Sequence, residues 1–345
     1  MAPLDPLAGG SGKCKEIVFK SAEDDDYLKL LNTFDQLARD LELRPRLDMF
    51  SDKTEMSCQI PDNRTYLIGD YSNGKISIYS DIFGNVWSYP MPGVYDCWMR
   101  PNGNVIAAGY DKVVEIDPDI SSGHGGKLLW SYEQGSAGSD YKGKSEVHSC
   151  QLLPDGNVLI AEAGLPRLLE MDPQGQLVRT INLPLTDQGV HEQIRMVRSD
   201  GEGNYWVSYL GDGIIYKVNT RGEVIRKIDL EKGETSPHLV YEALPLPNGN
   251  ILVSGAGTGK VMELDPRGEI VWEIAQNELP GIKLDWIAGI QRLPNDNTII
   301  SNWGNGQSEV KALELTPDKK IVWQLTNKSF KGISRIQVLP SGAYR

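Results

Sequence analysis

Short runs of alternating apolar and polar residues, separated by tight-turn residues, recur along most of this chain. The segment 101–109 reads PNGNVIAAG, and close copies begin at Pro154 and Pro247. Weaker copies begin at Asp200 and Pro294. In the close copies Asn-Gly or Asp-Gly supplies the positive φ of a tight turn, and β-branched residues follow it. The pattern therefore predicts a hairpin of two short strands at each of these places.

A second apolar element with its own turn follows each hairpin. VMELDPRGEIVW, ending at Trp272, is a clear example, and the other copies end at Trp87, Trp130, Val178, Ile225 and Trp323. Successive end points lie 43, 48, 47, 47 and 51 residues apart. Each unit thus holds four short strands, and four strands in about 45 residues are typical of a β-propeller blade.

The first and last parts of the repeat complement one another. Six copies of the second element are present, but the first has no opening strand before Tyr66. GISRIQVLPSG, at 332–342, matches the missing strand at the far end of the repeat. We therefore predict an all-β fold, a six-bladed β-propeller over residues 61–345 closed by the C-terminal strand, which leaves no open edge between the blades.

Residues 1–60 differ from the repeat. Apolar side chains such as Tyr27, Leu30, Phe34 and Leu41 form one helical stripe behind the acidic start of a helix. We predict a leader and a short N-terminal helical extension that packs on the propeller, with a protein partner docked on this helix as the alternative. The first residues lack the basic and apolar regions of a signal peptide.

Bulk composition excludes several classes of protein. The formal charge of −12 and the lack of a Lys/Arg cluster argue against binding nucleic acid. No run of 18 apolar residues is present, so we expect no membrane span. The four cysteines form no CxxC pair. Cys97 and Cys150 occupy equivalent blade positions and are either buried thiols or a disulfide.

Three segments carry a resemblance to known proteins. LDWIAGIQRLPNDNTIISNWGNGQ, EVHSCQLLPDGNVLIAEAG and VMELDPRGEIVWEI resemble bacterial six-bladed propeller proteins of the PQQ-like or arylsulfotransferase-like repeat type. The resemblance covers about residues 64–342 and implies a propeller exported to the periplasm or cell exterior. It implies no single reaction, because a fold of this kind carries many activities.

Two activities of related propellers bear on the chemistry. Quinoprotein dehydrogenases sandwich a quinone and hold calcium, and neither site can be placed in this sequence, so no cofactor is assigned. Arylsulfotransferases use a histidine near the channel with further His and Arg nearby. By that resemblance His148, His191 and Arg195 are the catalytic candidates, although the longer signatures around them do not match.

The first strand of each propeller blade lines the central channel, so residues at these strand starts meet at one mouth. Aligning the blades on the turn proline brings together a first set of candidates: Tyr95, Asp96, His148, Tyr241, Glu242 and Arg335. An insertion in the fourth blade leaves two counterparts of His148 open, Glu192 and Arg195. His191 and His238 lie in or beside equivalent connections, whereas His124 lies in an expected surface hairpin.

The loops between the second and third strands open on the same face. They and the connection into the last blade supply a second set of candidates: Asp70, Tyr71, Tyr110, Glu162, Tyr209, Asn302, Trp303, Asp285 and Trp286. Aromatic rings combined with carboxylates and histidine suit a sugar or another polar ring, because stacking supplies contact area and polar groups fix orientation.

These residues favour a propeller that binds, and can act on, a small polar ligand such as a carbohydrate at the channel mouth. The alternatives are a protein-interaction scaffold without catalysis and an arylsulfotransferase-like or quinone-dependent enzyme. The histidines themselves are open to three interpretations: structural hydrogen bonding, a substrate or acid–base role, or a metal site. Their unequal offsets weigh against a metal, and we assign none.

Overall fold

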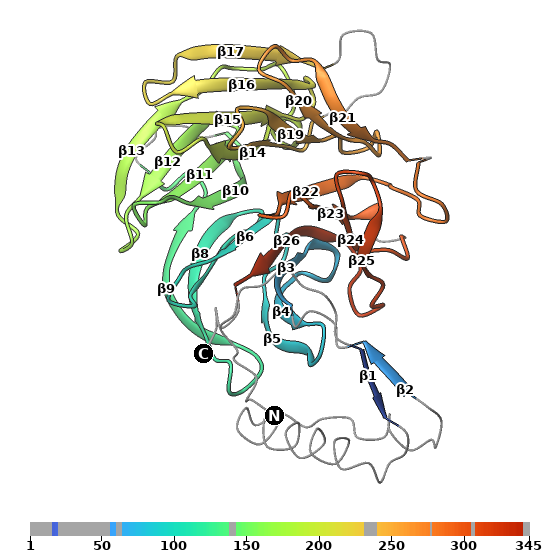
Figure 1. The fold of residues 1–345 in the computed structure, drawn as a ribbon. Coiled ribbons are helices and arrows are strands. Elements are labelled where there is room, and N and C mark those ends of the chain that lie inside the picture. Colours follow the sequence, from blue (N-terminus) through green and yellow to red (C-terminus); the bar gives the residue numbers. More distant parts are fainter. Residues whose placement is uncertain are drawn as a thin grey trace.

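The computed structural model of the protein describes residues 64–137, 143–230, 240–276, 278–304 and 308–340, together with the backbone of 16–19 and 56–59. Within these ranges the chain forms six four-stranded antiparallel sheets (Figure 1). The prediction of a six-bladed, all-β propeller is confirmed.

Each sheet is one blade, and its strands follow one another from the inside outward. Blade one consists of β26 (Ile333–Leu339), β3 (Thr65–Asp70), β4 (Lys75–Ser80) and β5 (Gly84–Pro90). Blade two consists of β6 (Asp96–Met99), β7 (Val105–Ala108), β8 (Lys112–Pro118) and β9 (Gly126–Glu133). Blade three consists of β10 (Glu146–Leu152), β11 (Val158–Ala163), β12 (Arg167–Met171) and β13 (Leu177–Asn182).

The remaining three blades repeat this order. Blade four consists of β14 (Ile194–Ser199), β15 (Asn204–Tyr209), β16 (Ile214–Asn219) and β17 (Val224–Asp229). Blade five consists of β18 (Glu242–Pro245), β19 (Ile251–Ser254), β20 (Val261–Leu264) and β21 (Ile270–Ile274). Blade six consists of β22 (Ile287–Arg292), β23 (Thr298–Asn302), β24 (Ala312–Leu315) and β25 (Ile321–Leu325).

The C-terminal strand closes the ring as predicted. β26 pairs antiparallel with β3, with Ile336 opposite Ile68. In Figure 1 the red β26 lies beside the blue β3, so the two ends of the repeat share one sheet.

The N-terminal region contains one small element that the sequence did not predict. β1 (Glu16–Phe19) and β2 (Met56–Gln59) pair antiparallel, with Ile17 opposite Cys58. The helix predicted between them falls outside the described residues. Across the ranges given above, no helix has the length and apolar character needed to cross a membrane. The short 3-10 turns η2 (Tyr71–Asn73) and η3 (Val190–Glu192) are described.

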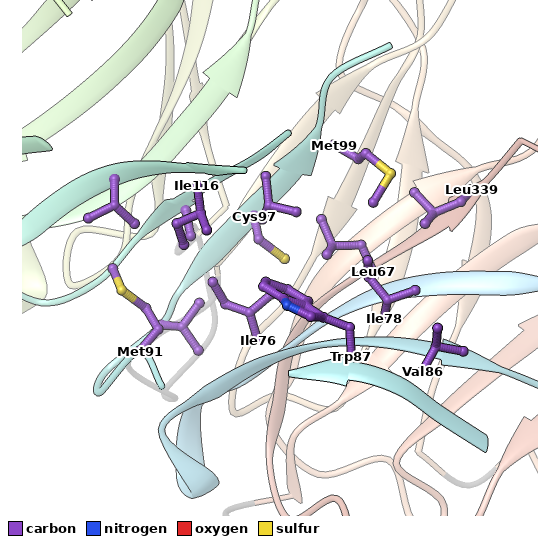
Figure 2. Close-up of a cluster of buried hydrophobic side chains, with 14 residues drawn as sticks. Leu67, Ile76, Ile78, Val86, Trp87, Met91, Cys97, Met99, Ile116 and Leu339 are labelled. Atoms are coloured by element: carbon purple, nitrogen blue, oxygen red, sulfur yellow. The ribbon is translucent and has the colours of Figure 1, made fainter. Parts of the chain in front are cut away.

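Apolar side chains fill the space between neighbouring blades. Figure 2 shows the cluster between blades one and two, where Trp87, Leu67 and Ile76 contact Cys97 and other side chains of blade two. The indole of Trp87 also donates a 2.6 Å hydrogen bond to the carbonyl of Gly125 in blade two. Burying one such large apolar side chain stabilises the fold by about 1.5–3 kcal/mol, so these clusters hold the blades together.

Polar side chains link the inner strands of successive blades. The side-chain carbonyl of Gln151 accepts from the Ser199 backbone N–H of the next blade at 2.7 Å. Gln291 and Gln337 repeat this arrangement toward their own neighbours. Cys97 and Cys150 are free, buried thiols. The side chains at these repeat positions therefore serve the fold.

Candidate functional site

Strand register identifies one residue from each blade at the same depth in the channel. Cys150 of β10 pairs with Ile160, and Val197 of β14 pairs with Val207 at the equivalent place in the next blade. Counting two residues back from each, Arg195 is the counterpart of His148, and Glu192 is not. We call the six equivalent residues the mouth ring. They are at most 2% exposed: Tyr95, His148, Arg195, Tyr241, Ala288 and Ser334.

Four of the six inner strands change register at the mouth ring. The pairing skips His148 in β10 and Ser334 in β26, and it also passes over Ala288 in β22 and Arg195 in β14. A bulged residue is left out of the ladder and bends its strand, which re-aims its side chain. At these four positions the side chains therefore need not follow the regular alternation between the two faces of the sheet.

A carboxylate and two histidines meet at one side of the mouth ring, and we call them the Glu–His cluster. Glu146 Oε2 lies 2.9 Å from His148 Nε2 and 2.9 Å from His191 Nδ1. Glu146 and His148 come from the buried start of β10, and His191 comes from η3. The His191 side chain is 43% exposed, so the cluster extends from the protein interior to its surface.

Contacts on every side fix the His148 ring. Its Nδ1 lies 2.7 Å from the carbonyl oxygen of Ile194, and Tyr95 packs against it edge-on at 4.9 Å between centroids. Burial, assisted by the charge of Arg195, lowers the pKa of His148 to about 4. The hydrogen bonds of His148 with Glu146 and the Ile194 carbonyl act in the opposite direction and are outweighed.

Glu146 is ionised and shared between several donors. Lys144 Nζ lies 2.5 Å from Oε1, and the Tyr110 hydroxyl also hydrogen bonds this carboxylate. Burial alone would raise the pKa of Glu146, but the hydrogen bonds from His148, His191, Lys144 and Tyr110 outweigh it and hold the pKa far below its usual value. The cluster thus carries a fixed negative charge at its centre.

Arg195 and Tyr241 present unused polar atoms inside the mouth ring. The Arg195 guanidinium lies between the Tyr95 and Tyr241 rings, 5.1 Å and 5.8 Å from their centroids, and donates one 2.8 Å hydrogen bond to the His191 carbonyl. In the described part of the chain, Arg195 Nε and the Tyr241 hydroxyl have no hydrogen-bond partner. Buried polar groups left unpaired cost about 1–3 kcal/mol each.

Half-buried aromatic rings surround the mouth ring. Tyr71 lies 4.6 Å from Trp303 and 5.0 Å from Tyr95, and Trp303 meets Trp286 edge-on at 6.1 Å, all between centroids. Tyr110 lies 6.2 Å from Tyr95 and stacks on His191 at 5.8 Å, also between centroids. Trp286 adopts a φ of 55°, which is rare for a bulky residue and is found where a site imposes it.

A second polar group, which we call the ion-pair layer, lies next to the mouth ring: Asp96, Glu242 and Arg335 each follow a ring residue directly, and Arg198 lies three positions after Arg195. Arg198 bridges Asp96 at 2.9 Å and Glu242 at 2.5 Å, and Arg335 contacts the same two carboxylates at 3.7 Å and 2.9 Å. All four side chains are at most 2% exposed. Gly289 leaves room for them, since a Cβ there would lie 3.0 Å from Arg335 Cδ and 2.8 Å from the Ser334 carbonyl.

The structure separates the predicted site residues into groups. His148, His191, Arg195, Tyr95, Tyr110, Tyr241, Trp286 and Trp303 gather at the mouth. Asp96, Glu242 and Arg335 form the ion-pair layer instead. His238 lies outside the described residues.

The other candidates are engaged with the protein itself. Glu162 binds Arg167 at 2.6 Å, and the Tyr209 hydroxyl donates to the Pro184 carbonyl at 2.6 Å. Asn302 ties its loop to the Asp285 backbone. Glu192 lies in η3 beside His191.

Sequence reasoning missed Glu146, the centre of the Glu–His cluster. Its signal was present, since Glu146 lies two residues before His148 at the start of a strand. Residues at i and i+2 share one face of a strand, but no repeat copy pointed to this position. Lys144, which neutralises one oxygen of Glu146, was missed for the same reason.

A groove of about 450 Å³ lies at the other end of the inner strands, between the turns at Pro101, Pro154 and Gly201. Its charged groups already have partners: Arg100 binds Glu115 through two 3.0 Å hydrogen bonds, and Asp200 pairs with Lys217 at 2.8 Å. The unused polar atoms therefore favour the mouth ring over this groove.

Comparisons with known proteins establish the fold. No family model and no curated protein matches the sequence. A protein of unknown function from Bacteroides caccae superposes with a TM-score of 0.69 at 24% identity, over 80% of this chain and 98% of that one. A streptogramin B lyase superposes at 0.52 and 14% identity, over 82% of this chain and 96% of that one.

A third solved structure is a catalytically inactive histidine-to-alanine variant of virginiamycin B lyase from Staphylococcus aureus with quinupristin. It superposes at a TM-score of 0.50 and 15% identity, over 79% of this chain and 87% of that one. The neighbours are bacterial six-bladed propellers. At these identities they show a shared architecture and no shared reaction.

Proposed function

We propose that the protein binds a small polar ligand at the mouth of its channel, and that the ligand is a sugar with an acidic group. One observation carries the proposal: Arg195 Nε and the Tyr241 hydroxyl are buried without a hydrogen-bond partner among the residues the structure describes. Buried polar groups almost always have a hydrogen-bond partner, and here a ligand at the mouth would supply it.

The chemistry of Arg195 favours an anion. Guanidinium N–H groups form their strongest hydrogen bonds with carboxylates or sulfates, often through two donors at once. Among the described residues, Arg195 donates to one protein oxygen, the His191 carbonyl. No carboxylate of the described chain pairs with it, whereas Arg198 and Arg335 in the next layer each contact two.

The surrounding rings favour a ring-shaped ligand. Tyr71, Tyr110, Trp286 and Trp303 are partly exposed around the mouth ring and offer flat faces and edges. Sugar rings pack on such faces through their C–H groups, while the hydroxyls reach polar atoms such as the Tyr241 hydroxyl.

A matched pair of probes tests the proposal. D-glucuronate and D-glucose differ at one carbon, which carries a carboxylate in the first. We expect D-glucuronate to raise the melting temperature of the wild type more than D-glucose does, because ligand binding stabilises the folded state by mass action. The shift should vanish in Arg195→Met and persist in Arg221→Met, a control at an exposed arginine on a distant turn.

Further probes distinguish the alternatives. A larger shift with 4-nitrophenyl sulfate than with D-glucuronate would favour an arylsulfotransferase-like site, and a shift with pyrroloquinoline quinone would favour a quinone-dependent enzyme. If no probe shifts the wild type, ligand binding at the mouth is wrong and the scaffold alternative takes its place.

A further inference from the structure

Three side-chain atoms with the properties of metal ligands converge in the Glu–His cluster. One ligand atom each from Glu146, His148 and His191 lie within 4.8 Å of one another. Both histidine nitrogens lie 2.9 Å from the same carboxylate oxygen, Oε2. Ligands bound at about 2.0–2.2 Å from one ion lie about 3–3.5 Å apart, so small movements of these side chains would bring all three to one ion.

The partner of the other His148 nitrogen supports this role. The Ile194 carbonyl only accepts hydrogen bonds, so Nδ1 at 2.7 Å carries a hydrogen and Nε2 is the nitrogen that faces Glu146. A histidine that binds a metal through one nitrogen almost always donates its other N–H to a carbonyl or carboxylate. The peptide of Ile194 therefore holds His148 in the orientation that a metal requires.

Nε2 of His148 faces the Glu146 carboxylate, whose oxygens only accept hydrogen bonds. A metal ion bound to both atoms takes the place of a proton on Nε2, and metal binding releases that proton.

We propose that Glu146 Oε2, His148 Nε2 and His191 Nδ1 bind one divalent transition-metal ion of the zinc class. Two imidazoles and one carboxylate suit such an ion, whereas Mg²⁺ and Ca²⁺ prefer oxygen ligands throughout. Three protein ligands leave a further coordination position, on the side where His191 is exposed. The inference goes beyond the proposed function, because the ion binds whether or not a sugar is present.

Two nearby cationic side chains would repel a bound metal ion and so weaken its binding. Lys144 contacts Oε1 of the same carboxylate at 2.5 Å, and the charge of Arg195 acts on His148. Removing the positive charge of Lys144 should therefore strengthen metal binding, whereas removing a ligand should weaken it.

Calorimetric titration of Zn²⁺ into the metal-stripped, untagged full chain tests the site, with Mg²⁺ as the comparison ion. We expect one Zn²⁺ per chain and no Mg²⁺ binding. The affinity for Zn²⁺ should fall at least tenfold in Glu146→Gln and in His191→Ala, because each variant removes one of three ligands. His124→Ala removes an exposed surface histidine and should bind Zn²⁺ as the wild type does.

His191 lies on a short, partly exposed turn, so His191→Ala keeps the test informative if Glu146→Gln fails to fold. Lys144→Met should bind Zn²⁺ several-fold more tightly than the wild type. Equal Zn²⁺ binding by the wild type, His191→Ala and Lys144→Met would overturn the inference, as would the absence of Zn²⁺ binding by the wild type. Neither result bears on the sugar proposal, which Arg195→Met and D-glucuronate test separately.

Discussion

Two polar clusters occupy successive layers of the same channel, and they differ in how their charges are paired. In the ion-pair layer two arginines and two carboxylates balance in charge and contact one another, although Asp96 Oδ1 and Arg335 Nε, 3.7 Å apart, form no hydrogen bond within the described chain. In the mouth ring, Arg195 has no carboxylate partner within the described chain, and Arg195 Nε and the Tyr241 hydroxyl lack hydrogen-bond partners there.

The difference separates two roles that burial alone cannot distinguish. Both layers are buried, and both contain residues that the sequence marked as ligand-binding candidates. A charge-balanced network rigidifies the core, and breaking it leaves an unpaired charge. A partly satisfied cluster destabilises the fold until a ligand or ion completes it. We therefore propose a structural role for the ion-pair layer and a binding role for the mouth.

The largest effect is expected in the ion-pair layer. Arg198→Met removes the bridge between Asp96 and Glu242 and leaves two buried carboxylates facing one remaining arginine. The free energy of unfolding should fall by about 3–5 kcal/mol. Urea unfolding followed by tryptophan fluorescence measures this loss, and a change below about 1 kcal/mol, the size typical of an exposed ion pair, would show that the layer is not structural.

Lowering the pH should remove part of this stability, because Glu242 becomes protonated. Burial alone would raise the pKa of Glu242, but the charges of Arg198 and Arg335 outweigh it and hold the pKa below its usual 4.5. A carboxylate with a lowered folded-state pKa stabilises the fold above its unfolded-state pKa, and this contribution is lost as the pH falls through the folded value.

The difference in unfolding free energy between wild type and Glu242→Gln should therefore be largest near pH 7 and shrink below about pH 4. Urea unfolding of both proteins over this pH range measures it. A difference that stays constant with pH would mean that Glu242 is not ionised in the folded protein.

The smallest effect on stability is expected at the mouth ring. Tyr241→Phe removes a buried hydroxyl without a partner and keeps the ring that packs against Arg195. The free energy of unfolding should stay unchanged or rise by up to about 1 kcal/mol, because the desolvation cost of the hydroxyl disappears. Binding of D-glucuronate should weaken at the same time. A loss of more than 1 kcal/mol in urea unfolding would place Tyr241 with the structural residues.

The architecture could be predicted from the sequence because it repeats. Asn-Gly turns and apolar runs recur at similar intervals, so the missing strand before Tyr66 pointed to the segment now seen as β26. The same alignment placed Tyr95, His148 and Tyr241 at one level, where the structure has them in the mouth ring.

The functional grouping could not be predicted in the same way, because it depends on departures from the repeat. Bulges change the register at His148 and Arg195, and η3 brings His191 to Glu146 across 45 residues. The alignment also made Tyr241 and Glu242 ligand-binding candidates alike. In the structure the Tyr241 hydroxyl has no hydrogen-bond partner among the described residues, whereas Glu242 contacts Arg198 and Arg335. Only the contacts of each side chain distinguish the two layers.

The comparison can be tested most directly in one experiment on Arg195 and Arg198, two buried arginines three positions apart on β14. Urea unfolding of Arg195→Met and Arg198→Met is measured with and without D-glucuronate. We predict that the free energy of unfolding of Arg195→Met stays within about 1 kcal/mol of the wild-type value. D-glucuronate should no longer stabilise this variant, because the guanidinium proposed to bind its carboxylate is gone. Arg198→Met should be several kcal/mol less stable and keep that stabilisation. Equal loss of stability in both variants, with D-glucuronate stabilising both alike, would contradict the division between a structural layer and a binding mouth.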